Sequence, residues 1–395
     1  MISVEDATTR ITAAFKPLPA ESIAIGDAAG RVLAEDAVAR ANQPPEAVSS
    51  MDGYAVRTAD ARAGATLNVI GASPAGNPYR GMIGVGEAVR IFTGGVVPGG
   101  ADAIVIQEDT TANGAQVTLA ETAVSGRHIR LQGLDFKTGE TLLRKGRRLT
   151  ARDLSLLAAA DLAAVNVVRK PRVVFAATGD ELSRPGEPRK PGGIVASSGY
   201  GLSAMIAVWG GEPVDLGIVP DTMDAVAGIA ERSKGSDLVV TLGGASVGDH
   251  DLIQKALGPE GFALDFWRIA MRPGKPLIFG RLGTTPLLGL PGNPVSTLVC
   301  ALLFLRPAIA AMLGETMPTT FRRARLLGAM PENASRQDYV RARTELHNGD
   351  LWVEPFAVQD SSMQSVLARA DALIVRTPHA KPAQAGETVE ILPLD

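Results

Sequence analysis

Two glycine-rich loops contain the residue types best suited to binding an anion. The first, residues 242–251, reads Leu-Gly-Gly-Ala-Ser-Val-Gly-Asp-His-Asp, and the second, residues 290–296, reads Leu-Pro-Gly-Asn-Pro-Val-Ser. Each loop lies between a strand-like run and a helix-like run. Glycine has no Cβ, so backbone N–H groups can approach an anion closely beside the positive end of a helix. The loops therefore predict a site for a phosphorylated ligand, with these candidate residues: Gly243, Gly244, Ser246, Gly248, Pro291, Gly292, Asn293, Pro294 and Ser296.

Residues 244–248 also fit the Gly-x-Ser-x-Gly pattern of a serine-hydrolase nucleophile. A hydrolase needs a histidine downstream, and the available histidines are His250, His347 and His379. His250 is too near in sequence, and the other two lie in the terminal β-rich region. An anion-binding loop is therefore favoured, with a plain strand-to-helix turn as the alternative.

Acidic side chains follow several expected strands. Asp180 and Glu181 come directly after one strand and Asp221 after another, while Asp249 and Asp251 begin a helix. Aspartate is a common helix N-cap, so capping is the alternative interpretation for the last three. Carboxylates gathered on one rim suit Mg²⁺ and do not suit zinc, which prefers histidine and cysteine. The sequence thus predicts a metal site at Glu181, Asp221, Asp249 and Asp251.

Basic side chains lie between the two glycine loops. Arg268, Arg272 and Lys275 follow an expected strand at residues 265–270. They are either solvated surface charges or a cluster that converges on an oxyanion. Arginine favours the second interpretation, because its guanidinium can bind an oxyanion through two parallel hydrogen bonds.

The elements that position these residues alternate between strand and helix from residue 171 onward. Strands are expected at residues 172–177, 213–219 and 237–242, and helices at 198–209, 221–234 and 251–257. This alternation predicts a doubly wound parallel α/β sheet, in which ligands bind at the carboxyl ends of the strands. Short strand-like runs separated by glycine and proline predict small β-rich domains at residues 43–139 and beyond 318.

The composition limits the classes of function. A chain of 395 residues is too long for one core, and a net charge of −3 provides no overall field for nucleic acid or an anionic membrane. The single cysteine, Cys300, excludes an intrachain disulfide and a cysteine-rich metal site. Its apolar surroundings predict a small buried helix residue. We find no N-terminal signal pattern and no uninterrupted apolar run near about 18 residues, so we expect a cytoplasmic protein that does not contact membranes.

Seven motifs, in order along nearly the whole chain, resemble the molybdopterin molybdenumtransferase family, the MoeA type that also forms the E domain of gephyrin. The motifs lie at residues 50–55, 93–102, 130–135, 178–182, 243–248, 272–276 and 290–296. The resemblance implies an elongated homodimer of four domains. The first domain, for dimerisation and linking, comprises residues 1–42 and 140–170. The second, residues 43–139, contributes to the partner subunit's site. The third, residues 171–317, resembles molybdopterin adenylyltransferase, and the fourth, residues 318–395, is β-barrel-like.

The resemblance also implies a reaction, the insertion of molybdate into adenylylated molybdopterin with Mg²⁺-dependent release of AMP. The catalytic residues it implies are Asp52, Thr93, Asp135, Glu181, Asp221 and Asp251. The molybdate-binding residues it implies are Arg268, Arg272, Lys275, Arg341 and a serine at Ser361 or Ser365. Arg268 and Arg272 stand where the family usually has lysine, which raises the question of oxyanion selectivity. A non-catalytic dimeric scaffold and the adenylyltransferase step itself are the alternatives, and molybdopterin adenylyltransferase is also an expected partner.

Overall fold

The computed structural model describes residues 1–244, 252–316 and 321–394, which form two compact units. One unit comprises residues 22–167, and the other comprises residues 1–21 together with 168–395. The chain therefore passes twice between the units, at residues 21–22 and at residues 167–168. We describe each unit separately.

The unit of residues 22–167 contains a six-stranded, mostly antiparallel sheet. Its strands, in spatial order, are β7 (Ala103–Ile106), β4 (Gly53–Val56), β6 (Glu87–Ile91), β5 (Thr66–Ser73), β9 (Gln116–Leu119) and β8 (Thr110–Asn113). Buried aliphatic side chains on the two faces form two small cores, one around Val56 and Val105 and the other around Val89 and Ile104. These short strands agree with the β-rich character expected for residues 43–139.

A third core of this unit surrounds helix α2 (Ala151–Ala159) and includes Phe136, Leu149 and Leu157. The buried carboxylate of Asp153 fixes the start of the helix. It accepts hydrogen bonds from the backbone N–H and the hydroxyl of Thr150, both at 2.8 Å, and from Arg147 Nη2 at 2.8 Å. This contact satisfies one of the backbone N–H groups that helix geometry leaves unpaired.

The other unit contains the α/β sheet, with strand order β16-β13-β17-β21-β20-β18. The strands are β13 (Arg172–Thr178), β16 (Glu212–Val219), β17 (Leu238–Leu242), β18 (Phe262–Trp267), β20 (Ile278–Leu282) and β21 (Thr285–Leu290). The expectation of a parallel sheet is correct for β16, β13, β17 and β21. Strand β20, which the sequence analysis did not name, runs antiparallel to both of its neighbours, because the two residues that separate it from β21 allow only a hairpin turn.

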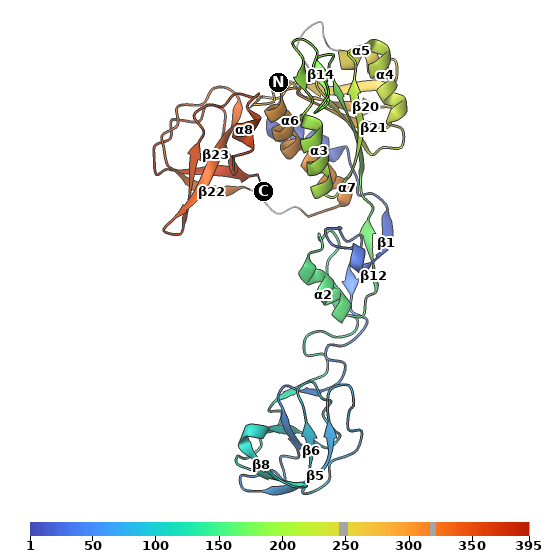
Figure 1. Cartoon of the computed structure of the whole chain (residues 1–395), viewed down its shortest axis with the longest axis vertical. Coiled ribbons are helices and arrows are strands. Elements are labelled where there is room, and N and C mark those ends of the chain that lie inside the picture. Colours follow the sequence, from blue (N-terminus) through green and yellow to red (C-terminus); the bar gives the residue numbers. More distant parts are fainter. Residues whose placement is uncertain (245–251, 317–320, 395) are drawn as a thin grey trace. The chain divides into compact units, whose positions relative to one another are not determined.

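Helices cover both faces of this sheet (Figure 1). Helices α4 (Met223–Arg232) and α5 (Leu252–Leu257) pack on one face through Val226, Ile229 and Ile253. Helices α3 (Ser198–Val208), α6 (Pro294–Cys300) and α7 (Arg306–Leu313) lie on the other face. The arrangement confirms the predicted doubly wound fold.

Helix α6 continues through a π-helical stretch, Ala301–Leu305, into α7. The continuous helix, Pro294–Leu313, is the one helix among the described residues that is long and apolar enough to cross a bilayer. It is not an uninterrupted apolar run, because it contains Ser296, Thr297 and Arg306, but its mean hydropathy is 1.9. The helix is a core helix, because 78% of its most apolar window is buried inside the protein. Cys300 is fully buried within it, as predicted, and burial raises the pKa of its thiol.

The C-terminal segment of this unit forms a small closed sheet. Its strands are β22 (Arg322–Leu326), β23 (Gln337–His347), β24 (Asp350–Pro355), β25 (Ala372–Arg376) and β26 (Thr388–Pro393). Because β25 pairs with both β26 and β23, the sheet closes on itself as a barrel. Strand β19 (Met271–Arg272), from the α/β segment, pairs with the start of β23 and joins the barrel to the α/β sheet.

Candidate functional site

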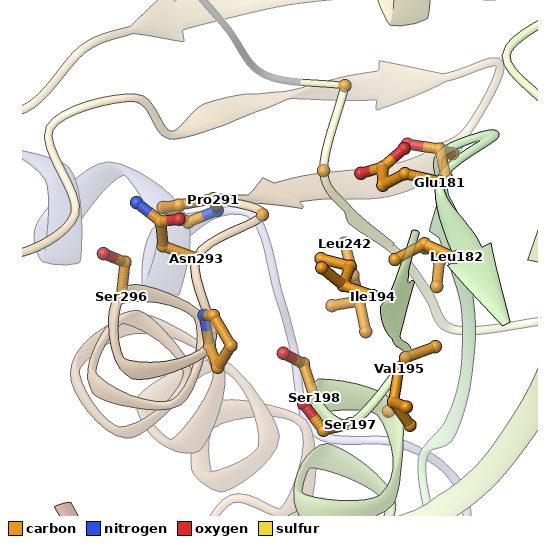
Figure 2. Close-up of a pocket in the computed structure, with 18 of the residues that line it drawn as sticks. Glu181, Leu182, Ile194, Val195, Ser197, Ser198, Leu242, Pro291, Asn293 and Ser296 are labelled. Atoms are coloured by element: carbon orange, nitrogen blue, oxygen red, sulfur yellow. The ribbon is translucent and has the colours of Figure 1, made fainter. Parts of the chain in front are cut away.

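A cavity of about 420 Å³ lies at the carboxyl ends of β13, β17 and β21, where the sequence predicted a ligand. One side is apolar and includes Leu182, Ile194 and Leu242 (Figure 2). The other side is formed by Asn293, at the end of the second glycine loop, and Ser296, in the first turn of α6 (Figure 2). The cavity therefore offers an apolar surface and a polar surface to the same ligand.

The two glycine loops meet at this cavity. The backbone N–H of Gly243 donates to the carbonyl oxygen of Leu290 at 3.1 Å, which joins the ends of β17 and β21. Gly243 has a φ of +94°, and a Cβ there would lie 2.9 Å from the carbonyl oxygen of Thr178, so a side chain at this position would be strained. Within the described residues, a Cβ on Gly292 would come within 4 Å of one atom, the Cα of Gly243, at 3.5 Å. The loop backbones thus approach each other closely at Gly243 and Gly292.

Most of the predicted ligand-binding residues line the cavity. They are Gly243, Gly244, Pro291, Gly292, Asn293, Pro294 and Ser296. Four other predicted residues, Ser246, Gly248, Asp249 and Asp251, lie outside the described residues.

A helix N-terminus contributes to the polar side. Asn293 is the N-cap of α6 and Pro294 is its first residue, a position that proline favours. The hydroxyl of Thr297 donates to the carbonyl oxygens of Pro291, at 2.6 Å, and Asn293, at 3.0 Å. Both carbonyls therefore point toward the helix, and the loop is fixed between the strand and the helix.

Two of the predicted acidic residues reach the same rim. Glu181 follows β13 and Asp221 follows the neighbouring β16, and both line the cavity. The side chain of Asp180 accepts a hydrogen bond from the backbone N–H of Asp221 at 3.3 Å, which links the two strand ends. Among the described residues, no three His, Cys, Asp or Glu side chains lie close enough together to hold a metal ion.

The predicted cationic residues lie on the segment that leads to Pro276, and none of them is among the described residues that line the cavity. Arg272 forms an ion pair with the buried Asp338 of the barrel, which competes with any oxyanion for its guanidinium. Arg268 stacks on Trp267 at 3.8 Å, and its buried Nε finds no hydrogen-bond partner in the part of the chain that the structure describes. Lys275 is exposed.

The barrel supplies side chains to the cavity rim. Asn293 Nδ2 donates to Ser361 Oγ at 3.0 Å, and the Ser361 carbonyl oxygen accepts from the backbone N–H of Val295 at 3.2 Å. Gln364 Nε2 donates at 2.7 Å to the hydroxyl of Ser197, which lines the cavity. The sequence analysis named Ser361 but missed Gln364. The other candidate, Ser365, is exposed, and its carbonyl oxygen accepts from the side chain of a nearby arginine on the surface.

Arg341 supports the segment that carries Ser361. The arginine is 1% exposed, and burial lowers the pKa of its guanidinium, while the nearby charge of Asp360 opposes that change. Its Nε donates to Gln359 Oε1 at 3.0 Å, and its Nη1 donates to the carbonyl oxygen of Asp360 at 2.7 Å. The structure thus shows Arg341 bonded to the loop next to Ser361, and its predicted contact with molybdate remains a prediction.

The unit of residues 22–167 contains the other three predicted catalytic residues. The backbone N–H and the hydroxyl of Thr93 donate to Asp52 Oδ1 at 2.7 and 2.8 Å. These hydrogen bonds, with a smaller contribution from the charge of Arg90, hold the pKa of the Asp52 carboxyl below its ordinary value. Asp135 is exposed, and its backbone N–H donates to the carbonyl oxygen of Gln43 at 2.9 Å. That Asp52, Thr93 and Asp135 face the cavity of a partner subunit remains a prediction.

Comparison with known proteins covers nearly the whole chain. Three family models match in order: the MoeA N-terminal region (domain I and II) over residues 2–160, a probable molybdopterin binding domain over 175–311, and the MoeA C-terminal region (domain IV) over 323–394. The molybdopterin molybdenumtransferase of Haemophilus influenzae is 36% identical, covering 96% of this chain and 95% of the relative. That of Bacillus subtilis is 34% identical, covering 99% and 94%. The crystal structure of the molybdopterin biosynthesis MoeA protein from Pyrococcus horikoshii matches all of both chains, with a TM-score of 0.86 and 28% identity.

Proposed function

Because the chain belongs to the molybdopterin molybdenumtransferase family, an enzyme family of molybdenum cofactor biosynthesis, we propose that it inserts molybdate into adenylylated molybdopterin and releases AMP in a Mg²⁺-dependent step. The observation that carries the proposal is the cavity at the strand ends, where two glycine loops, a helix N-terminus and two carboxylates meet. Each of these features suits one part of a phosphorylated substrate.

The two glycine loops support binding of the phosphate groups. The backbone N–H of Gly243 already donates to Leu290 and that of Val295 to Ser361, and Pro294 has no N–H. In the proposal, the N–H groups of Gly244, Gly292 and Ser296 are therefore the donors for phosphate oxygens, and the helix dipole favours negative charge there. The apolar side, which includes Leu182, Ile194 and Leu242, suits a flat ring of the substrate. The ligand would therefore lie with its phosphates toward Gly243 and Gly292.

Glu181 and Asp221 fit a Mg²⁺ ion, because both provide carboxylate oxygens at one rim of the cavity. Asp249 and Asp251 are the further ligands in the proposal. When bound, Mg²⁺ would neutralise charge on the phosphoanhydride oxygens. The hydrogen bond from the Asp221 backbone to Asp180 keeps the two strand ends together, so that both carboxylates face the same ligand.

Hydroxyl and cationic donors support the binding of molybdate, which is a tetrahedral dianion. Ser361 lies against Asn293 at the cavity loop, and Ser296 lines the cavity. We assign Arg341 a role in holding the segment of Ser361. The remaining predicted donors are Arg268, Arg272, Lys275 and Ser365. Since Asp338 pairs with Arg272, release of that pair would accompany any direct contact of Arg272 with molybdate.

The proposal includes a homodimer in the cytoplasm. In it, Asp52, Thr93 and Asp135 of one subunit complete the cavity of the other, and the substrate is received from molybdopterin adenylyltransferase. The fixed, ionised Asp52–Thr93 pair supports a polar contact of this kind, because its carboxylate and hydroxyl are already oriented.

The test follows AMP release and molybdenum incorporation when the purified protein meets adenylylated molybdopterin, Mg²⁺ and molybdate. We expect the two products to form together. Glu181→Gln should reduce both rates about tenfold or more, which corresponds to about 1.4 kcal/mol of lost stabilisation, without changing the unfolding temperature. Glu231→Gln on the surface of α4 is the control, because Glu231 is exposed and forms an ion pair with the equally exposed Lys234.

Two results would contradict the proposal. Nucleotide binding without metal uptake would favour a scaffold, and ATP-dependent adenylylation of molybdopterin would favour the adenylyltransferase step.

A further inference from the structure

Arg90 lies between two aromatic rings in the unit of residues 22–167. It is on β6, directly opposite Tyr54 on β4. Its guanidinium carbon lies 5.0 Å from the centroid of the Tyr54 ring and 5.0 Å from that of Phe92. Tyr54 is only 7% exposed. Because a planar guanidinium stacks on aromatic faces, these contacts restrict the side chain to one orientation.

The same guanidinium bonds to the strand that follows Asp52. Arg90 Nη1 donates to the carbonyl oxygen of Gly53 at 3.1 Å, and Nη2 donates to Gln107 Oε1 at 2.6 Å. The backbone N–H of Gln107 in turn donates to the carbonyl oxygen of Asp52 at 3.0 Å. A Cβ on Gly53 would lie 2.0 Å from the carbonyl oxygen of Val105, so β4 and β7 are too close there for any side chain. Arg90 therefore holds the backbone that follows Asp52, directly at the Gly53 carbonyl and through Gln107 at the Asp52 carbonyl.

Three strand ends meet at this point. Asp52 directly precedes β4, Thr93 follows β6, and Gln107 follows β7. Arg90 is itself on β6. It contacts β4 through Gly53 and the end of β7 through Gln107. The Asp52–Thr93 pair depends on this alignment, because its two short hydrogen bonds join the first strand end to the second.

We propose that Arg90 is a positioning residue, which fixes the Asp52 carboxylate against Thr93 for the reaction in the adjoining subunit. The role rests on the proposed function, in which Asp52 acts on the substrate. Arg90 acts through its own chain and does not touch the substrate. Its positive charge also favours the ionised form of Asp52, while Glu108, which accepts from Gln107 Nε2 at 3.2 Å, is the other charged group beside this cluster.

Two variants separate the charge of Arg90 from its geometry. Arg90→Met keeps an apolar stem between the rings but removes both the charge and the hydrogen bonds. Arg90→Lys keeps the charge but loses the planar fork that reaches Gly53 and Gln107 together. Arg80→Met is the matched control, because Arg80 forms an exposed ion pair with Glu46 in the same unit.

The experiment uses the full chain and two readouts. Carbon-13 NMR of labelled aspartate follows the titration of Asp52, with its signal assigned by loss in Asp52→Asn. The pKa of Asp52 should rise in Arg90→Met and stay low in Arg90→Lys. The kcat of molybdenum insertion should fall roughly tenfold to a hundredfold in both variants, with little change in KM, because orientation is lost and substrate contacts are kept. Arg80→Met should match the wild type in both readouts.

An unchanged Asp52 titration in Arg90→Met would overturn the proposal, since Arg90 would then act on stability alone. A kcat within about twofold of the wild type in both variants would also overturn it. If Arg90→Met fails to fold, Arg90→Lys decides the question through kcat. If the wild-type protein inserts no molybdenum, the proposed function fails, whereas the NMR titration still shows whether Arg90 controls Asp52.

Discussion

A single methyl group at Gly292 tests whether the ligand lies between the two glycine loops. Gly292 is outside the left-handed region, and among the residues that the structure describes a Cβ there would have one neighbour, the Cα of Gly243, at the ordinary contact distance of 3.5 Å. Gly292→Ala should therefore leave the free energy of unfolding unchanged or raise it by up to about 1 kcal/mol, because alanine restricts the unfolded chain. The methyl group would nevertheless occupy the space between the loops.

The expected loss is in ligand affinity. A hydrogen bond from a backbone N–H to a charged group contributes about 1.5–3 kcal/mol, so losing one such bond weakens binding about 10- to 100-fold. Gly243→Ala is the contrasting variant. Its φ of +94° and the 2.9 Å approach to the Thr178 carbonyl oxygen predict an additional loss of roughly 1–3 kcal/mol in stability.

Calorimetric titration with AMP, together with thermal unfolding, distinguishes these effects. Gly292→Ala should bind AMP more weakly and unfold at or above the wild-type temperature. Gly243→Ala should bind AMP more weakly and also unfold at a lower temperature. Wild-type affinity for AMP in a folded Gly292→Ala protein would refute the reasoning, because the phosphate would then lie elsewhere.

Two further predictions concern the start of α2 and the barrel. Asp153→Asn should lower the free energy of unfolding by about 1 kcal/mol at pH 7. Burial raises the pKa of Asp153, but hydrogen bonds from Arg147 and Thr150 outweigh burial and leave it below the ordinary value. The difference in free energy of unfolding between the wild type and Asp153→Asn should be greatest above about pH 4 and should shrink as the pH falls through the lowered pKa. Equal differences at pH 7 and pH 2 in urea unfolding would contradict this prediction. Ser361→Ala should raise the KM for molybdate several-fold, roughly as expected for one lost hydrogen bond, at an unchanged unfolding temperature. A larger effect from Ser365→Ala would transfer the role to that serine.

The glycine loops and the acidic residues at the strand ends could be predicted, because each is marked by residues that are close together in the sequence. Glycine between a strand-like run and a helix-like run permits a close backbone approach, and the structure shows such an approach at Gly243 and Gly292, while their contact with a phosphate remains a prediction. Glu181 and Asp221 could be placed on one rim because the carboxyl ends of parallel strands share one edge of a sheet. Both now line the cavity.

Contacts between distant segments could not be predicted in the same way. Nothing near Asp338 in the sequence marks it as the partner of Arg272, and nothing near Gln364 marks its bond to Ser197. Arg341 was assigned to molybdate by the family resemblance alone, and no local pattern marked it as a buried side chain bonded to Gln359 and Asp360. Its burial depends on a barrel that closes only when β23 pairs with β25.

The bonds of Ser361 and Gln364 to the cavity loops also affect how such proteins can exchange segments by recombination. A crossover between α7 and β22 would join the barrel of one ancestor to the α/β sheet of another. The descendant would receive Asn293 and Ser197 from one parent and their hydrogen-bond partners from the other. The two segments are therefore expected to be inherited as one block, although they fold as separate sheets.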